Sequence, residues 1–78
     1  MDKNIIIYST PTCPYCKMVK QYLDGNKIEY TDYDVSENKE KAAEMTKKSE
    51  QMGVPVIDID GKIIVGFRKD IIQKELGI

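Results

Sequence analysis

The first apolar segment of the chain is continuous rather than alternating. Residues 5–8 read Ile-Ile-Ile-Tyr and are followed by Ser9, Thr10 and Pro11. A β-branched run of this length, closed by residues that favour turns, is typical of a strand buried on both faces of a sheet with parallel pairing. We therefore expect a central strand at residues 5–8.

A helical pattern follows this strand. Pro14 is suited to the first position of a helix, and Gly25 is suited to its C-terminal end. The apolar residues that recur at helical spacing between them are Met18, Val19, Tyr22 and Leu23. The first unit is thus predicted to be a strand, a loop and a helix.

The middle of the chain predicts an edge strand and a second helix. In residues 29–35 tyrosines and a threonine alternate with acids, and the pattern changes phase midway, which indicates a strand at a sheet edge. Ser36 is expected to cap a helix that runs to Met52, with Gly53 as its terminator. The residues expected on the inner side of this helix are Ala42, Ala43, Met45, Ser49 and Met52.

The last part of the chain predicts a hairpin and a short helix. Val54-Pro55-Val56-Ile57 reads as a strand entered through a proline. Asp60-Gly61 is typical of a two-residue turn into a strand at residues 62–65, and the two strands are expected to pair antiparallel. A final helix is predicted at residues 70–76. The residues expected to face inward on it are Ile71, Ile72 and Leu76.

These elements predict an α/β fold with the order β-α-β-α-β-β-α and a four-stranded mixed sheet. The right-handed crossover rule fixes the arrangement of the first unit. This order is that of a minimal thioredoxin fold. At 78 residues the chain has room for a single domain, which we expect to span residues 1–78.

Charge and hydropathy narrow the classes of partner. The net charge is −1 with acids and bases interspersed, so no basic block points to nucleic acid or to an anionic membrane surface. The apolar run at residues 5–8 is too short for a signal peptide or a membrane span. We expect a cytoplasmic monomer whose partners are proteins or small molecules. In that compartment thiols are kept reduced, and a disulfide is usually transient and catalytic.

The chemistry is expected at Cys13-Pro14-Tyr15-Cys16, which holds both cysteines of the chain. A dithiol that exchanges with disulfides needs one sulfur that attacks as a thiolate and a second that resolves the mixed disulfide. With Pro14 at the first helical position, Cys13 is expected at the N-cap, where the amides of Tyr15 and Cys16 and the helix dipole favour a thiolate. Cys16 lies one turn further on and is expected to stay a shielded thiol until it attacks. We therefore predict Cys13 and Cys16 as the catalytic residues.

A structural disulfide and a zinc site are the alternatives. On the loop-entropy estimate, closing so short a loop stabilises a protein by only about 2 kcal/mol. A structural zinc ion takes about four ligands, whereas the motif supplies two thiols and the chain has no histidine. We therefore favour a redox role and expect no metal and no tightly bound cofactor.

Three features together resemble the glutaredoxins: Cys-Pro-Tyr-Cys after a short strand, Val54-Pro55 before a later strand, and Gly66 ahead of the last helix. The resemblance covers essentially the whole chain. It implies a thiol–disulfide oxidoreductase that reduces protein disulfides or glutathione mixed disulfides through Cys13, with glutathione as its reductant. The residues that it implies for substrate binding are Thr10, Pro11, Tyr15, Val54, Pro55, Gly66, Phe67 and Asp70.

The resemblance also implies a cis Val54–Pro55 peptide bond beside Cys13. Such a bond can present the backbone of Val54 to an extended substrate in a short β-like pairing. Taken without the resemblance, the sequence favours a trans bond, which is the commoner state of bonds that precede proline.

Two positions depart from the glutaredoxin pattern. Thr10 stands where the family typically carries a lysine, and Val65-Gly66 stands where it carries two glycines. The segment Gly66-Phe67-Arg68 followed by Asp70 is more similar to the glutaredoxin-like redoxins that donate electrons to class Ib ribonucleotide reductase and are recharged by thioredoxin reductase. The electron source therefore stays open between glutathione and a flavoprotein reductase.

Two other functions are alternatives to this one. In an iron–sulfur carrier, two chains would each give one thiolate to a cluster, but cluster-binding members of the family usually lack a proline at the position of Pro14. A regulatory binding module could use the same fold as a scaffold. The intact dithiol argues against that alternative.

Overall fold

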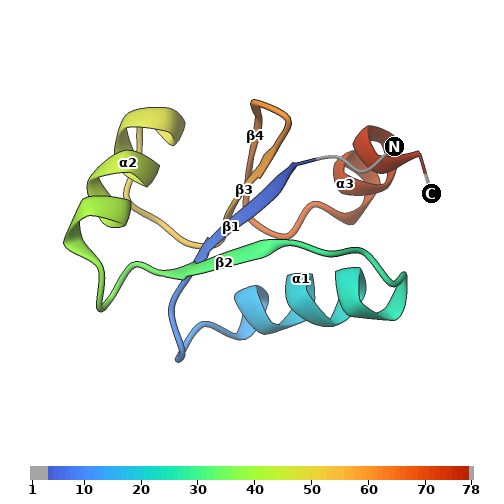
Figure 1. Ribbon diagram of the computed structural model, residues 1–78, viewed down its shortest axis with the longest axis horizontal. Coiled ribbons are helices and arrows are strands. Elements are labelled where there is room, and N and C mark those ends of the chain that lie inside the picture. The colour runs from blue at the N-terminus through green and yellow to red at the C-terminus, as the bar shows by residue number, and fades with distance from the viewer. Residues whose placement is uncertain (1–3, 78) are drawn as a thin grey trace.

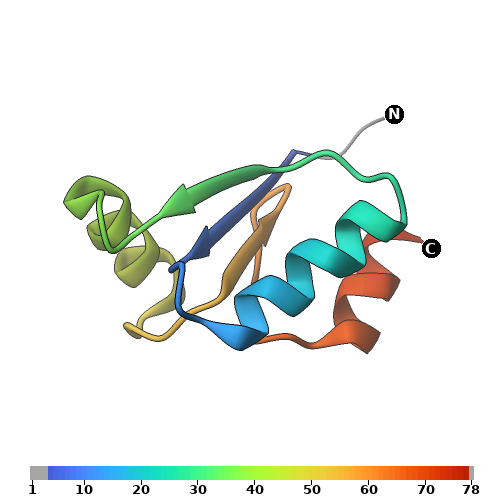
Figure 2. The same ribbon diagram turned by 90° about the horizontal axis from the view of Figure 1, so that it is seen from below.

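The computed structural model describes residues 4–77 and has a four-stranded sheet with helices on both faces (Figures 1 and 2). The elements are β1 (Ile5–Ser9), α1 (Pro14–Gly25), β2 (Thr31–Asp34), α2 (Lys39–Ser49), β3 (Val56–Ile59), β4 (Lys62–Val65) and α3 (Lys69–Leu76). The strand order is β2-β1-β3-β4, with β1 parallel to β2 and the other pairs antiparallel. The predicted element order, mixed sheet and thioredoxin fold are confirmed. No helix within residues 4–77 is long and apolar enough to cross a membrane.

The two faces of the sheet carry separate apolar clusters. α1 and α3 cover one face, and α2 covers the other (Figure 2). The buried residues of the first cluster are Ile5, Ile7, Val19, Leu23, Ile57, Ile59, Ile64 and Ile72. On the opposite face, Met45 of α2 packs against Tyr8 and Val56. Met18, which the spacing placed on the apolar side of α1, is 43% exposed, so the buried stripe of that helix is narrower than predicted.

The centre of the sheet and the hairpin follow the sequence closely. β1 lies between β2 and β3, and both Ile7 and Tyr8 are fully buried, as expected for a central strand. β3 and β4 are joined by Asp60 and Gly61, which both have positive φ angles, +50° and +94°. A two-residue turn of this type matches the twist of the strands and fixes their register, with Ile59 opposite Lys62.

The start of α2 differs from the prediction. Asn38 is its N-cap, and the Asn38 side-chain oxygen accepts a hydrogen bond from the backbone N–H of Lys41 at 3.1 Å. Ser36, the predicted cap, donates its hydroxyl to a carboxylate oxygen of Asp34 at 2.5 Å, and its own N–H donates to the same oxygen at 2.9 Å. Asp34 therefore holds Ser36 in the preceding turn. The prediction was wrong because asparagine caps as well as serine does, and because Asp34 competes for the hydroxyl and N–H of Ser36.

The end of α2 also comes earlier than predicted. The helix stops at Ser49, and Glu50 takes a left-handed conformation with φ of +59°. Met52 lies beyond the helix and is 81% exposed, and Ala43 is exposed as well, so neither belongs to the inner face as predicted. Met45 is the buried residue of this helix.

A polar network joins α2 to the sheet. Asp58 of β3 is only 7% exposed, and it accepts a hydrogen bond from the Lys48 ammonium group at 2.8 Å. Lys48 also donates to the Tyr8 hydroxyl at 2.9 Å, and that hydroxyl donates to Glu44. The hydrogen bond with Asp58 raises the pKa of Lys48, and the hydrogen bond from Tyr8 lowers the pKa of Glu44. Because a buried carboxylate without its partner is costly, this pairing fixes where α2 lies on the sheet.

The cap of α2 gives a test of this local structure. Asn38→Ala removes the oxygen that accepts from the Lys41 amide, and we expect it to lower the free energy of unfolding by about 1 kcal/mol. Asn38→Asp keeps an acceptor at the same place and is the matched control. Urea unfolding followed by circular dichroism measures both, and an alanine variant as stable as the aspartate variant would contradict the cap.

Candidate active site

The sulfur of Cys13 lies at the start of α1. Cys13 has extended backbone angles and is the N-cap of the helix, as predicted, and Pro14 follows it at the first helical position. The N–H of Cys16 donates to the Cys13 sulfur at 3.2 Å, and the N–H of Cys13 donates to the carbonyl of Thr10 at 3.3 Å. Both cysteines are free thiols. The helix start thus directs an amide and the positive end of its dipole at one sulfur.

The two cysteines differ in their exposure to solvent. Cys13 is half-buried, whereas Cys16 is fully buried within the first turn of α1. Burial, followed by the hydrogen bond with Cys13, raises the pKa of the Cys16 thiol to about 12. Cys16 is therefore a shielded thiol at neutral pH, as the sequence predicted.

The segment before β3 lies beside the Cys13 sulfur. The Val54–Pro55 peptide bond is cis, which confirms the prediction. The thiol of Cys13 points to the carbonyl oxygen of Val54 at 3.9 Å. Pro55 is buried, and its carbonyl accepts a hydrogen bond from the N–H of Gly66 at 2.8 Å. Gly66 has φ of +84°, a conformation that favours glycine.

Gln51, which the sequence did not single out, fixes the segment that leads to Val54. Its side-chain amide donates to the carbonyl of Gly53 at 3.0 Å and accepts from the N–H of Gly53 at 2.5 Å. The same amide donates to the Ser49 hydroxyl at 3.2 Å, and that hydroxyl donates to the carbonyl of Gln51 at 3.0 Å. A Cβ atom on Gly53 would lie 2.7 Å from the Gln51 side-chain oxygen, so the bare glycine leaves room for this contact. The signal in the sequence was a glutamine two positions ahead of a glycine. This pair is too common to identify a positioning residue by itself.

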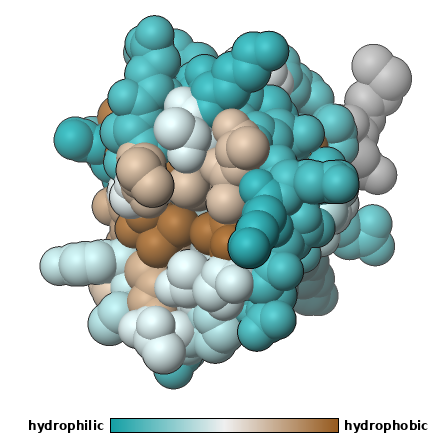
Figure 3. All heavy atoms as spheres, turned by 90° about the vertical axis from the view of Figure 1, so that its left-hand side faces the viewer, coloured by the Kyte–Doolittle hydropathy of each residue, from teal (hydrophilic) through white to brown (hydrophobic). Residues whose placement is uncertain are grey.

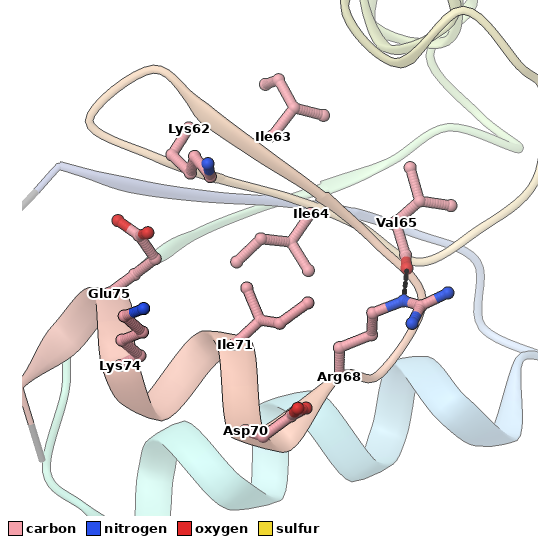
Figure 4. Close-up of a pocket in the computed structure, with 9 residues that line it drawn as sticks. All are labelled: Lys62, Ile63, Ile64, Val65, Arg68, Asp70, Ile71, Lys74 and Glu75. Atoms are coloured by element: carbon pink, nitrogen blue, oxygen red, sulfur yellow. Dashed lines mark hydrogen bonds between the residues drawn. The ribbon is translucent and has the colours of Figure 1, made fainter.

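The remaining predicted site residues lie in three places. Pro11 and Tyr15 are exposed next to the cysteine pair, and Tyr15 is 61% exposed. The Phe67 side chain instead packs edge-on against Tyr22 of α1, with ring centres 6.1 Å apart, and belongs to the core. Asp70, in the first turn of α3, lines a groove between α3 and β4 (Figure 4).

The edge of the sheet toward which β1 and β2 run is partly apolar. Figure 3 looks onto this edge and shows apolar atoms gathered in a shallow hollow at its centre, with polar atoms around them. Two exposed apolar side chains belong to the segments that flank the Val54–Pro55 bond: Met52 precedes it, and Val65 pairs with Val56 across the hairpin. Such a surface suits contact with another molecule better than with water.

Known proteins are similar to this chain in sequence and in the arrangement of its elements. The family model described as Glutaredoxin matches residues 5–64. The chain is 53% identical over 70 residues to an uncharacterized glutaredoxin-like 8.6 kDa protein in a rubredoxin operon of Clostridium pasteurianum, a match that covers 90% of this chain and 93% of that protein. It is 36% identical over 63 residues to Glutaredoxin 3 of Escherichia coli strain K12, covering 81% of this chain and 76% of that protein.

A solved structure agrees with these sequence matches. The crystal structure of the thioredoxin-like protein BC3987 superposes with a TM-score of 0.87 at 28% identity, covering 92% of this chain and 99% of that one. The match of the family model extends from β1 to β4 and includes both cysteines. The chain therefore belongs to the glutaredoxin family and is a thiol–disulfide oxidoreductase with Cys13 and Cys16 as its CxxC pair.

Proposed function

We propose that this protein reduces protein disulfides and glutathione mixed disulfides, with Cys13 as the attacking sulfur and Cys16 as the resolving thiol. The observation that supports these roles is the difference between the two cysteines. Cys13 is accessible and caps α1, whereas Cys16 is fully buried and held as a thiol. An attacking thiolate needs access to its substrate, and a resolving thiol must only reach the first sulfur.

The reaction moves two electrons from the dithiol to the substrate. The Cys13 thiolate attacks one sulfur of the substrate disulfide, forms a mixed disulfide and releases the other substrate sulfur as a thiolate. Cys16 then loses its proton and attacks the Cys13 sulfur, which releases the second substrate sulfur and closes the Cys13–Cys16 disulfide. The released thiolates take up protons, so one substrate disulfide becomes two thiols.

The contacts of Cys16 support this order of the steps. Burial is the largest cause of its raised pKa, and the hydrogen bond and the charge of Cys13 raise it further. Once Cys13 is part of a mixed disulfide, its charge is gone and only burial continues to oppose ionisation of Cys16. The resolving thiol therefore becomes easier to deprotonate after the first attack has taken place.

In this proposal the substrate binds along the backbone of Val54. The Val54 carbonyl lies 3.9 Å from the Cys13 sulfur, so an extended chain that pairs with Val54 brings its own sulfur to Cys13. Thr10, Pro11, Tyr15 and Gly66 line the approach, and the buried Pro55 supports it through its carbonyl, which accepts from the N–H of Gly66. Gln51 acts as a positioning residue because it holds both peptide groups of Gly53, next to Val54. Asp70 is assigned to the ammonium group of glutathione, and Phe67 contributes through its backbone.

The oxidised protein must be recharged by a thiol or by a flavoprotein reductase. Two glutathione molecules reduce the Cys13–Cys16 disulfide to the dithiol and leave as glutathione disulfide. A reductase that carries electrons from NADPH would do the same without glutathione. We place this cycle in the cytoplasm, where thiols are kept reduced.

The cysteine roles predict opposite behaviour for two variants. Cys13→Ser should abolish the reduction of a protein disulfide, because no accessible sulfur remains. Cys16→Ser should stop at the mixed disulfide, which mass spectrometry detects as an adduct on Cys13. Full dithiol activity in Cys13→Ser would overturn the assignment.

The pKa of Cys16 predicts a pH profile. In Cys13→Ala, where Cys16 is the remaining thiol, its alkylation by iodoacetamide requires the thiolate, and burial still raises its pKa. Because the pKa is raised, the thiolate fraction is small at neutral pH and grows with pH. We expect the alkylation rate to rise about tenfold per pH unit from neutral pH, and to continue to rise beyond pH ~9 without a plateau. The rate for an exposed cysteine levels off near its ordinary pKa of about 8.5. A plateau below pH ~9 would show that Cys16 is not shielded in solution.

The two departures from the glutaredoxin pattern predict a gain in glutathione use. Thr10→Lys adds a cation for a carboxylate of glutathione, worth roughly 0–1 kcal/mol when exposed. Val65→Gly removes a branched, 40% exposed side chain next to Gly66. We expect the double variant to be reduced by glutathione several-fold faster, while its reduction by dithiothreitol changes little.

The control for this experiment is Thr12→Lys with Val65→Gly, which adds the same charge to the same loop at another position. Recharging the unaltered protein with glutathione in one sample, and with thioredoxin reductase and NADPH in another, compares the two electron sources directly. If the double variant gains nothing over the unaltered protein, Thr10 and Val65 do not limit the use of glutathione. A gain no larger than that of the control would show that Thr10 does not limit it.

A further inference from the structure

Strand β4 has a neighbour on one side only within residues 4–77, because it pairs with β3 and ends the sheet. In a two-residue hairpin the closing pair, here Ile59 and Lys62, exchanges both backbone hydrogen bonds, and every second residue does the same. The peptide groups of Ile63 and Val65 therefore point away from β3. A hydrogen bond from Arg68 is consistent with this direction, because its Nε donates to the outward carbonyl of Val65 at 3.4 Å (Figure 4).

A groove of about 690 Å³ runs along this free edge, between β4 and α3. Ile64 of β4 and Ile71 of α3 face each other between the two elements (Figure 4). The charged residues that line the groove are Lys62, Arg68, Lys74, Asp70 and Glu75. The groove thus carries one more cation than anions, although the whole chain has a net charge of −1. The three cations form no ion pair with any of residues 4–77.

One end of the groove is continuous with the active site. Val65 lines the groove, and the next residue, Gly66, donates its N–H to Pro55 at 2.8 Å. Val54, which precedes Pro55, contacts the Cys13 sulfur. The free edge of β4 is therefore about two strand spacings, or ~10 Å, from Cys13, a span that about three residues of extended chain can cover.

We propose that this groove binds an extended, acidic segment of the protein whose disulfide is reduced at Cys13. The segment pairs with the outward peptide groups of Ile63 and the outward N–H of Val65, and sets its carboxylates against Lys62, Arg68 and Lys74. Its contacting residues lie about three to seven positions from the reacting cysteine, given the distance to Cys13 and the length of β4. This proposal rests on the proposed reduction of protein disulfides. The preferred substrates are proteins with an acidic segment near the reacting cysteine.

A second copy of this chain is a poorer occupant of the same edge. Pairing β4 with β4 of another copy would bring two sets of the cations Lys62, Arg68 and Lys74 together. Like charges at close range oppose association, whereas an acidic partner is attracted. The groove therefore favours a partner of opposite charge.

Charge reversal at the end of the groove away from Cys13 tests the preference for acidic over basic peptides. Peptide homodisulfides carry either aspartates or lysines about three to seven positions from the cysteine, and the ratio of their kcat/KM values is measured with dithiothreitol as reductant. We expect the unaltered protein to prefer the acidic peptide and Lys62→Glu with Lys74→Glu to lower this ratio about five- to tenfold. The matched control, Lys27→Glu with Lys39→Glu, makes the same change in net charge outside the groove and should leave the ratio unaltered. Raising the salt to about 1 M should weaken the preference.

A second pair of variants tests the backbone pairing. Val65→Pro removes the outward N–H of an edge strand, where proline is tolerated, whereas Val65→Ala keeps it. We expect the kcat/KM for the acidic peptide to be about fivefold lower in the proline variant than in the alanine variant.

These measurements separate the groove from the chemistry. Equal kcat/KM for acidic and basic peptides in the unaltered protein, or a ratio that falls as much in the lysine control, would overturn the groove while reduction through Cys13 stands. A concentration-dependent dimer that Val65→Pro abolishes would show that a second copy occupies the edge instead. Failure to reduce any peptide disulfide would reject the proposed function itself.

Discussion

The hydrogen bond from the Cys16 amide to the Cys13 sulfur is the contact on which the site depends. It exists because Pro14 starts α1 directly after Cys13, so the sulfur meets an N–H group that has no partner inside the helix. The same turn of helix buries Cys16. One local arrangement therefore makes one cysteine available for attack and shields the other, without any further charged group.

The second half of the site is placed by tertiary contacts rather than by the helix. Lys48 is hydrogen-bonded to the nearly buried Asp58, which fixes the C-terminal part of α2 on the sheet. Ser49 and Gln51 then hold the turn that follows, up to Gly53. The position of the Val54 carbonyl beside Cys13 is thus set by a chain of polar contacts that begins where α2 meets the sheet. Stable anchoring of that helix is a condition for the site, although the helix itself carries no reacting group.

The features that could be predicted from the sequence are those governed by local rules. The apolar run of β1, the proline after Cys13 and the Asp60-Gly61 turn each have a short-range physical cause, and each was found where expected. The start of α2 was missed because Asn38 and Ser36 are both good caps, and the choice depends on Asp34 in the preceding turn.

Contacts between segments that are distant in the sequence were not accessible to the same rules. The pairing of Lys48 with Asp58 joins a helix to a strand, and the core position of Phe67 depends on Tyr22 of another helix. Neither has a signature in spacing or composition. The cis Val54–Pro55 bond was expected from family resemblance alone, since the sequence without it favoured trans.

The Val65 side chain affects both the approach of glutathione and the binding of protein substrates. In the structure it is an ordinary strand residue opposite Val56, so its backbone does not need the conformations that only glycine adopts easily. A β-branched residue supports a strand, whereas a glycine at this place would weaken it. The side chain that narrows the approach of a small ligand therefore also keeps β4 regular up to Gly66, next to the active site. On these physical grounds, the departure from the double glycine favours an extended polypeptide over a free tripeptide at this edge of the protein.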